Sequence, residues 1–438
     1  MGSTGQGRLI SLDVFRGMTI AGMVLVNNPG GPPVYWPLEH AEWNGLTPTD
    51  WIFPFFLFIV GVAISFSLGK RVRERPGRGV YTKIVIRAVS IYLCGAAIST
   101  IPFFQFQASD APDAVKLIVW LLFAAALFFL LLRRFKTAAV LAAAALAGIA
   151  LMNLASWNIV AYNYSTLRIM GVLQRIAAVY LVTSILFLHF SGKQLLGISV
   201  AILLGYWALL TLVPVPGCEV TTMNDKACNL AAYIDRLILT ENHIWRGGKV
   251  YDPEGILSTL PAIVTAISGV LAGKWLMKGG DASAAASASS EKANVLFAFG
   301  VLLLALGFVW NSWFPMNKSL WTSSYVVATS GLSLLVLGVC YWAIDLKGYR
   351  RWAWPFEVFG ANALALFVFS GIMARILISY RVDGAEGKPV SLLGWVMQNV
   401  YLPLASPIDA SWMYAVTFIL FWLFLMWLLY RRRIYIKL

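Results

Sequence analysis

Twelve long apolar runs dominate this sequence, and most are close to the length that an α-helix needs to cross a bilayer, about 20 residues. Only 12% of the 438 residues are charged, about half the share found in soluble domains. The sequence therefore predicts a single all-α domain over residues 1–438, a polytopic membrane helical bundle of about twelve transmembrane helices. The runs lie at residues 12–26, 51–68, 82–101, 114–132, 137–152, 168–190, 195–213, 255–276, 293–313, 323–344, 355–378 and 411–429.

Two segments leave the number of helices open between eleven and thirteen. The run at 137–152 is short, and residues 391–404 could form an additional interfacial or re-entrant segment. The low-complexity sequence at 279–292 is typical of a flexible linker.

Lys and Arg are distributed unevenly between alternate loops. With the N-terminus in the cytoplasm, and with basic residues close to the end of a run counted with the adjoining loop, 21 fall in inner segments, 9 in outer segments and four deeper within the runs. Because basic residues favour the cytoplasmic side, we expect both termini there and the large loop 214–254 outside. Such a topology accounts for the net charge of +14 without a nucleic-acid partner. The expected location is a bacterial inner (cytoplasmic) membrane.

The four cysteines do not show the spacing of a metal site, and no metal is expected. Cys94 and Cys340 lie in apolar runs and are interpreted as packing residues. Cys218 and Cys228 flank a polar part of the large outer loop and could form a disulfide in an oxidising compartment.

The loop between the first two runs is the strongest candidate for a site. The chain has only three histidines, and histidine most often carries proton transfer near neutral pH. His40 has polar and aromatic neighbours, namely Asn27, Trp43, Asn44 and Asp50. The alternative is an interfacial loop with a solvated histidine, whose tryptophans anchor the ends of the spans.

Charged side chains within apolar runs point to a functional interior or to a compensating pair. Asp13 and Arg16 lie three residues apart on one helical face, which fits either a local ion pair or a ligand site. Gln174 and Arg175 have no local acidic partner, which favours an aqueous cavity or an anionic ligand. Asn362 is interpreted as bonding across helices.

Acidic and aromatic residues cluster before two of the later runs. Asp235, Asp252 and Glu254 could lie on a solvated surface or at the positive end of a helix. With the aromatic residues beside them, they could instead bind a sugar. The segment NKSLWTSSYV, which carries Trp321 and Tyr325, offers a similar polar and aromatic approach to a run.

Several of these segments resemble one known family. The motifs occur in collinear order and cover most of the chain: SLDVFRG, VNN before a glycine-rich turn, EHAEWNGLTPTDWIFPFFLFIVG, GVLQRI, PVPGC to CN, YIDR, YDPEGIL and NKSLWTSSYV. Together they resemble the transmembrane acetyltransferases typified by heparan-alpha-glucosaminide N-acetyltransferase. The stretch 103–160 departs from the animal form, and the long soluble N-terminal region of that form is not expected here.

The resemblance implies transfer of an acetyl group from cytoplasmic acetyl-CoA to the amino group of a glucosamine-type sugar on the other face. It makes His40 the catalytic residue, as general base or acetyl carrier, with support from Asn27, and Asp50 could orient the imidazole. Basic residues on the inner side would hold acetyl-CoA, and we expect Asp13, Arg16 and Lys274 near it.

The sugar site that follows from the resemblance draws on the outer polar and aromatic residues, which are Trp43, Asn44, Gln174, Arg175, Asp235, Asp252, Glu254, Trp321 and Tyr325. The expected partners are acetyl-CoA, a terminal amino sugar and the lipid bilayer, and the Trp-rich and Phe-rich spans could support a homodimer. Two other functions remain open: an amino-sugar transporter, and an O-acetyltransferase of a cell-envelope polysaccharide.

Overall fold

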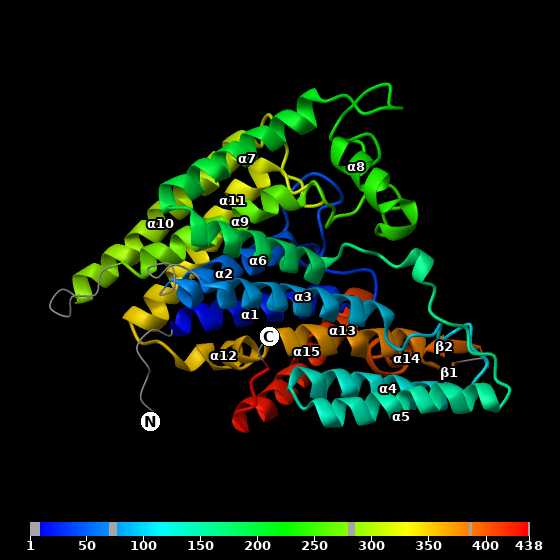
Figure 1. The fold of residues 1–438 in the computed structure, drawn as a ribbon. Coiled ribbons are helices and arrows are strands. Elements are labelled where there is room, and N and C mark those ends of the chain that lie inside the picture. Colours follow the sequence, from blue (N-terminus) through cyan, green and yellow to red (C-terminus); the bar gives the residue numbers. More distant parts are fainter. Residues whose placement is uncertain (1–8, 70–76, 279–284, 385–387, 437–438) are drawn as a thin grey trace. The chain divides into compact units, whose positions relative to one another are not determined.

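The computed structural model describes residues 9–69, 77–278, 285–384 and 388–436, and these residues form a helical bundle. Eleven of the described helices are long and apolar enough to span a membrane, or twelve if one bent helix pair counts as a span. The predicted polytopic all-α bundle is therefore confirmed. The long helices are α1 (Ile10–Asn27), α2 (Ile52–Leu68), α3 (Arg78–Thr100), α4 (Asp113–Leu131), α5 (Phe135–Leu154), α6 (Val172–His189), α7 (Gly192–Leu212), α9 (Thr259–Leu276), α10 (Ala285–Trp310), α11 (Ser323–Cys340) and α15 (Pro407–Arg431) (Figure 1).

The described chain divides into two compact units. The first unit holds residues 9–19, 40–93 and 168–360, and the second holds residues 20–39, 94–167 and 361–436, without the undescribed positions inside these ranges. The large loop and its short helix α8 (Leu230–Leu239) therefore belong to the first unit.

Helices α2 and α9 form the centre of the first unit, and glycines let their backbones approach closely. A Cβ atom on Gly61 would lie 1.8 Å from the carbonyl oxygen of Ala266, and one on Gly269 would lie 2.0 Å from that of Phe58. Small residues at such positions are typical of helix contacts in membranes. Further along both helices, Gly273 contacts Ser65, so the two helices run in parallel. Their N-terminal ends lie side by side as a result, and the loops that precede them meet there.

Two packed clusters fix the opposite ends of this unit. One joins the first turns of α1 to α2 and α11 through buried residues such as Phe15, Phe58 and Leu337. The other joins the end of α7 to the loops before α8 and α11, with Tyr206 donating a hydrogen bond of 2.5 Å to the carbonyl oxygen of Leu320. The second cluster lies at the end of the unit where α2 and α9 begin.

In the second unit, α4 and α5 pack against each other as a hairpin (Figure 1). A two-stranded antiparallel sheet pairs β1 (Arg381–Asp383) with β2 (Pro389–Ser391), in a register that places Val382 opposite Val390. The segment expected at 391–404 forms α14 (Leu392–Val396) and a π-helical turn (Met397–Tyr401), both too short to span a membrane.

Two predicted segments take a different form. The run at 355–378 is divided at Asn362 into α12 (Trp354–Ala361) and α13 (Ala363–Ser379). The Asn362 side chain bonds the backbone beyond α15, at Ile434 O and Ile436 N, rather than another helix. Of the linker expected at 279–292, residues 279–284 lie outside the described residues, and α10 begins at Ala285.

Candidate active site

A capped turn in front of α2 holds the carboxylate of Asp50. A short 3-10 helix (Pro48–Trp51) leads into α2, and Thr47 and Asp50 form a capping box at its start. One oxygen of Asp50, Oδ2, accepts hydrogen bonds from the amide of Ala41 at 3.1 Å, from the amide of Thr47 at 3.1 Å and from Thr47 Oγ1 at 2.9 Å. These bonds fix the orientation of a side chain that is only 1% exposed.

The other oxygen of Asp50 faces His40. The distance from His40 Nδ1 to Asp50 Oδ1 is 2.7 Å. Since an ionised carboxylate only accepts hydrogen bonds, His40 donates from Nδ1 and keeps Nε2 as an acceptor. Tyr325, which is fully buried, donates a hydrogen bond of 2.6 Å to the backbone oxygen of Asp50 and so stabilises the turn. The side chain of His40 is 50% exposed, so a substrate can reach the ring.

Lys318 completes this group, although it is not among the site residues predicted from the sequence. Its Nζ lies 3.0 Å from Nδ1 and 3.2 Å from Nε2 of His40, and 3.6 Å from Asp50 Oδ1. Burial lowers the pKa of Lys318, while the carboxylates of Asp50 and Glu254 act in the opposite direction. The lysine lies in NKSLWTSSYV, a segment singled out for its aromatic residues, on the side of the membrane where basic residues are expected to be rare.

Trp43 and Asn44 connect the His40 loop to two other loops. Trp43 Nε1 donates to the carbonyl oxygen of Met223 at 2.9 Å. Asn44 donates to Asn224 Oδ1 at 2.7 Å and accepts from Asn317 Nδ2 at 3.1 Å. These contacts bring together three loops that are far apart in the sequence. The predicted role of both residues in sugar binding stays a prediction.

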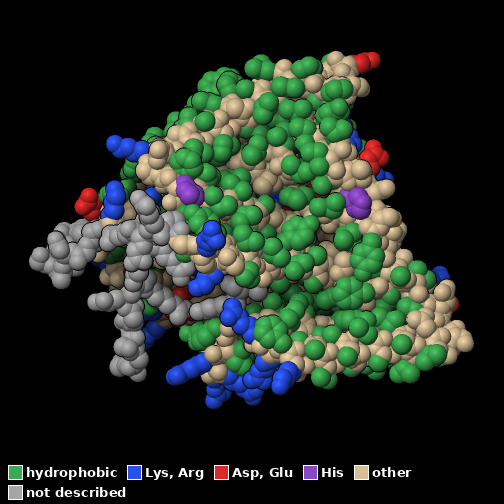
Figure 2. Space-filling view, viewed as in Figure 1, with side chains coloured by type: hydrophobic (Ala, Val, Ile, Leu, Met, Phe, Trp, Pro, Cys, Tyr) green, Lys and Arg blue, Asp and Glu red, His purple; other side chains and the backbone are tan. Residues whose placement is uncertain are grey.

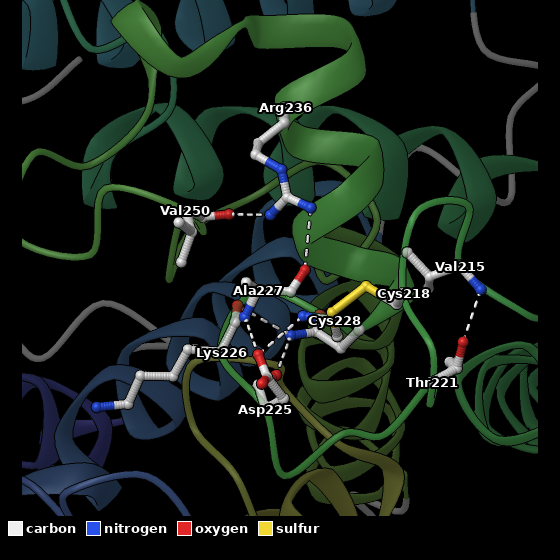
Figure 3. Close-up of a disulfide and its surroundings, with 10 residues drawn as sticks. Val215, Cys218, Thr221, Asp225, Lys226, Ala227, Cys228, Arg236 and Val250 are labelled. Carbon is white, nitrogen blue, oxygen red and sulfur yellow. Dashed lines mark hydrogen bonds between the residues drawn. A yellow bond between two sulfur atoms is a disulfide. The ribbon is translucent and has the colours of Figure 1, made fainter.

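The loop that carries Met223 is held by a disulfide between Cys218 and Cys228 (Figure 3). Asp225 accepts hydrogen bonds from the amides of Ala227 and Cys228, at 2.6 and 2.9 Å. Arg236 on α8 donates to the carbonyl oxygen of Ala227 at 2.9 Å, and so fixes the loop to the helix that follows it.

The acidic residues before α9 are paired with an arginine. Arg168 donates from Nε to Asp252 Oδ2 at 2.9 Å and from Nη2 to Asp252 Oδ1 at 2.5 Å, and it also pairs with Glu254. Burial by itself raises the pKa of Glu254, but the positive charges of Arg168, Arg175 and Lys318 together outweigh it, and the pKa lies below its usual value. Both carboxylates are buried, so they hold the loop in place, and Glu254 also attracts Lys318 electrostatically.

Arg175 is fully buried near the start of α6, and its neighbour Gln174 is buried as well. Its Nη2 donates to the carbonyl oxygen of Gly255 at 3.2 Å and to Ser258 Oγ. The guanidinium carbon lies 5.0 Å from the ring centre of Trp321, which is also buried. The Arg175 side chain has no accessible surface, and its predicted contact with an aqueous cavity or an anionic ligand stays a prediction.

Asp235 on α8 is buried next to the start of α9. Its Oδ1 accepts a bond of 2.8 Å from the amide of Ile256, and burial raises its pKa to about 7. An exposed Asp in the unfolded chain titrates near pH 4. The folded protein thus binds one more proton than the unfolded chain between about pH 4 and pH 7. The contribution of Asp235 to stability is full below pH 4 and is lost as the pH rises through 7.

We therefore expect Asp235→Asn to flatten the pH dependence of unfolding. The amide can still accept the bond from Ile256, but it does not ionise. The melting temperature of the wild-type protein in detergent should fall between pH 5 and pH 8 more steeply than that of the variant. Asp383→Asn, in the exposed strand β1, is the control and should follow the wild type. If the melting temperatures of Asp235→Asn and the wild type change with pH in the same way, the pKa of Asp235 is not raised by burial.

The residues expected near acetyl-CoA lie at the other end of the first unit. Arg16 pairs with Asp13 at 3.1 Å near the start of α1, and Lys274 lies 5.2 Å above the ring of Phe187 near the end of α9. Asn27 is the last residue of α1 and belongs to the second unit. Among the described residues, no group of three or more His, Cys, Asp or Glu could hold a metal ion.

The chain is similar to known N-acetyltransferases. A family model described as "Heparan-alpha-glucosaminide N-acetyltransferase, catalytic" matches residues 8–156, which include His40 and Asp50. Heparan-alpha-glucosaminide N-acetyltransferase of Homo sapiens is 29% identical over 411 residues, which cover 82% of this chain and 52% of the human protein. That of Mus musculus is 28% identical over 409 residues, with 83% and 53% covered. The chain spans about half the length of these relatives.

Proposed function

We propose that this chain, which is similar to heparan-alpha-glucosaminide N-acetyltransferases over most of its length, is an acetyl-CoA-dependent acyltransferase. It transfers the acetyl group from cytoplasmic acetyl-CoA to the amino group of a glucosamine-type sugar on the opposite face. One observation carries the proposal: His40 is held by a buried carboxylate at 2.7 Å, and half of its side chain remains accessible.

The chemistry follows from the position of His40 Nε2, the ring nitrogen that does not bond Asp50. The amino group of the sugar attacks the carbonyl carbon of the thioester in its neutral form, and Nε2 takes the proton that the nitrogen loses as the new bond forms. The carbon–sulfur bond then breaks, and His40 passes this proton to the leaving thiolate. In the covalent version, Nε2 itself takes the acetyl group before the amine does. Initial-rate patterns separate these routes, since intersecting lines indicate a ternary complex and parallel lines indicate an acetyl-enzyme.

Lys318 is proposed to stabilise the negative charge that develops on the carbonyl oxygen. Its ammonium group lies 3.2 Å from Nε2, so it is close to the bond-forming atoms when a substrate approaches that nitrogen. Such donors act where charge develops in the transition state, and removing one costs about 10² to 10³ in kcat. The supporting role of Asn27, which belongs to the second unit, stays a prediction.

We expect Lys318→Met to lower kcat by about 10²-fold with a small change in KM for acetyl-CoA. Lys318→Arg keeps the charge and should recover part of the loss. Lys249→Met, which removes an exposed lysine of the large outer loop, should stay within about twofold of the wild type. Steady-state kinetics of the three variants test this role. Equal kcat values for Lys318→Met and the wild type would exclude it.

A thiol-release assay tests the proposed function itself. Purified protein in detergent, given acetyl-CoA and glucosamine, should release free CoA thiol in proportion to N-acetylglucosamine. An amino-sugar transporter would release none. An O-acetyltransferase would release thiol but form an ester, which mild base cleaves and which mass spectrometry distinguishes from the amide.

A further inference from the structure

A large apolar groove in the first unit is separate from the His40 site. Its volume is about 770 Å³, and it is lined by residues of α7, α9, α10 and α11. Helix α7 packs on α9, and α10 packs on α11. Hydrophobic side chains are prominent on the visible surface over α7, at the upper edge of the molecule (Figure 2). The volume lies within the range of about 300 to 1,000 Å³ that is usual for small-molecule sites.

The lining of the groove suits hydrocarbon rather than a sugar or a phosphate. Its side chains are aliphatic or aromatic except for three serines, and none of them is charged. Ser199 donates to the carbonyl oxygen of Leu195 at 2.9 Å, and Ser268 donates to that of Thr265 at 2.7 Å. These hydroxyl protons are therefore used within the helices.

The groove has the length of one leaflet. It extends along α7 from Leu196 to Trp207, which is about 16 Å at 1.5 Å per residue. The hydrocarbon core of a bilayer is about 30 Å thick. One end of the groove is marked by Trp207, Trp310 and Trp313, the residue type that gathers at the membrane–water interface. The groove thus extends from its tryptophan end over a length of about half the thickness of the hydrocarbon core.

The tryptophan end of the groove lies at the same end of the unit as His40. After Trp310, α10 ends and the chain continues to Lys318. Trp310 and Trp43 pack against the same buried cluster, which includes Met223 and Leu320. A molecule with its tail in the groove would therefore have its head group in the layer that contains the imidazole.

We propose that this groove holds the hydrocarbon tail of the acceptor, so that the amino sugar is carried on a lipid. The inference rests on the proposed function and specifies its substrate class. An amphiphile whose tail fills the groove is held in one leaflet, with its sugar presented to His40. The groove would then raise the affinity for a lipid-linked sugar over a free one without any contact to the sugar itself.

The test compares two acceptors with the protein in lipid nanodiscs. Both carry the same free amino group, as dodecyl glucosaminide and methyl glucosaminide. We expect the dodecyl acceptor to have at least tenfold higher kcat/KM. Leu306→Trp, which places an indole in the groove, should remove this preference and leave kcat/KM for the methyl acceptor within twofold.

Leu302→Trp is the matched control on the same helix. Leu302 and Leu306 are similarly exposed, at 50% and 48%, but Leu302 does not line the groove. This variant should keep the preference. If Leu306→Trp keeps it too, the preference comes from partition into the membrane and the proposal is overturned. Equal loss with both acceptors would also overturn it.

A labelling experiment measures which molecule occupies the groove, independently of catalysis. Dodecyl glucosaminide with a diazirine at the end of its chain should label peptides of α7 and α10. A phosphatidylethanolamine with the same group should label them less. Equal labelling by the two probes would assign the groove to bulk lipid. Absence of labelling because a second copy of the chain covers the groove would assign it to a dimer contact. Either result overturns the proposal. Failure of the proposed function is seen separately, as absence of thiol release with the methyl acceptor.

Discussion

The His40→Ala variant is expected to lose acetyl transfer, with kcat about 10³-fold lower or less than can be measured. General base catalysis alone contributes about 10² to 10⁴ in rate, and a covalent route would lose its acetyl carrier altogether. Binding of acetyl-CoA should be retained, because the residues proposed to hold it lie at the other end of the first unit. Thiol release measures the rate, and calorimetry with acetyl-CoA measures the binding.

The loop should keep its fold in this variant. Asp50 retains three hydrogen bonds from Ala41 and Thr47 to its other oxygen, and Lys318 at 3.6 Å can pair with the oxygen that loses its partner. His189→Ala is the matched control. That histidine is exposed in the last turn of α6, where it contacts the hydroxyl of Tyr81 at 3.0 Å. Normal turnover by His40→Ala, or equal losses in both variants, would refute the assignment.

The second large effect is expected for Asp50→Asn. The three donors at Oδ2 should orient the new amide so that its oxygen replaces Oδ2, which leaves the NH₂ group facing His40 Nδ1. Nδ1 must then accept a hydrogen bond, and the ring proton moves to Nε2, where it blocks proton removal. The analogous change in serine proteases lowers kcat by about 10⁴ through the wrong tautomer. We expect a loss of 10² to 10⁴ in kcat here, with little change in KM.

Two control variants separate orientation from simple damage to the loop. Thr47→Val removes one hydrogen bond to Asp50 Oδ2 but leaves the contact with His40. It should lower thermal stability slightly and kcat by less than tenfold. Glu42→Gln removes an exposed carboxylate near His40 in the sequence and should leave kcat unchanged. If Asp50→Asn retains wild-type kcat, the carboxylate does not set the state of the imidazole.

Sequence patterns predicted what depends on short separations along the chain. Membrane spans follow from local hydropathy, and the number of helices long and apolar enough to span a membrane, among the described residues, lies within the predicted range. His40 and Asp50 are ten residues apart, and Thr47 with Asp50 forms a capping box that a linear reading can detect. A capped turn that leads directly into a helix leaves few ways to arrange these side chains.

The remaining parts of the site depend on packing between distant segments. Lys318 reaches His40 across 278 residues, and Arg168 reaches Asp252 across 84. Arg175 has no acidic neighbour in the sequence. Its hydrogen-bond partners, Gly255 and Ser258, lie about 80 residues away, just before α9. These contacts depend on the packing of α2, α6, α9 and α11 against one another, and a hydropathy profile contains no information on which helices are neighbours.

The most direct test of the account is a structure of the protein with a non-hydrolysable thioether analogue of acetyl-CoA. The quantity to measure is the distance from His40 Nε2 to the carbon of the analogue that stands in for the acetyl carbonyl. The account predicts about 3 to 4 Å, as in a near-attack arrangement, with the nucleotide toward the end of the unit that carries Arg16 and Lys274. An analogue bound with that carbon separated from His40 by packed side chains would contradict it.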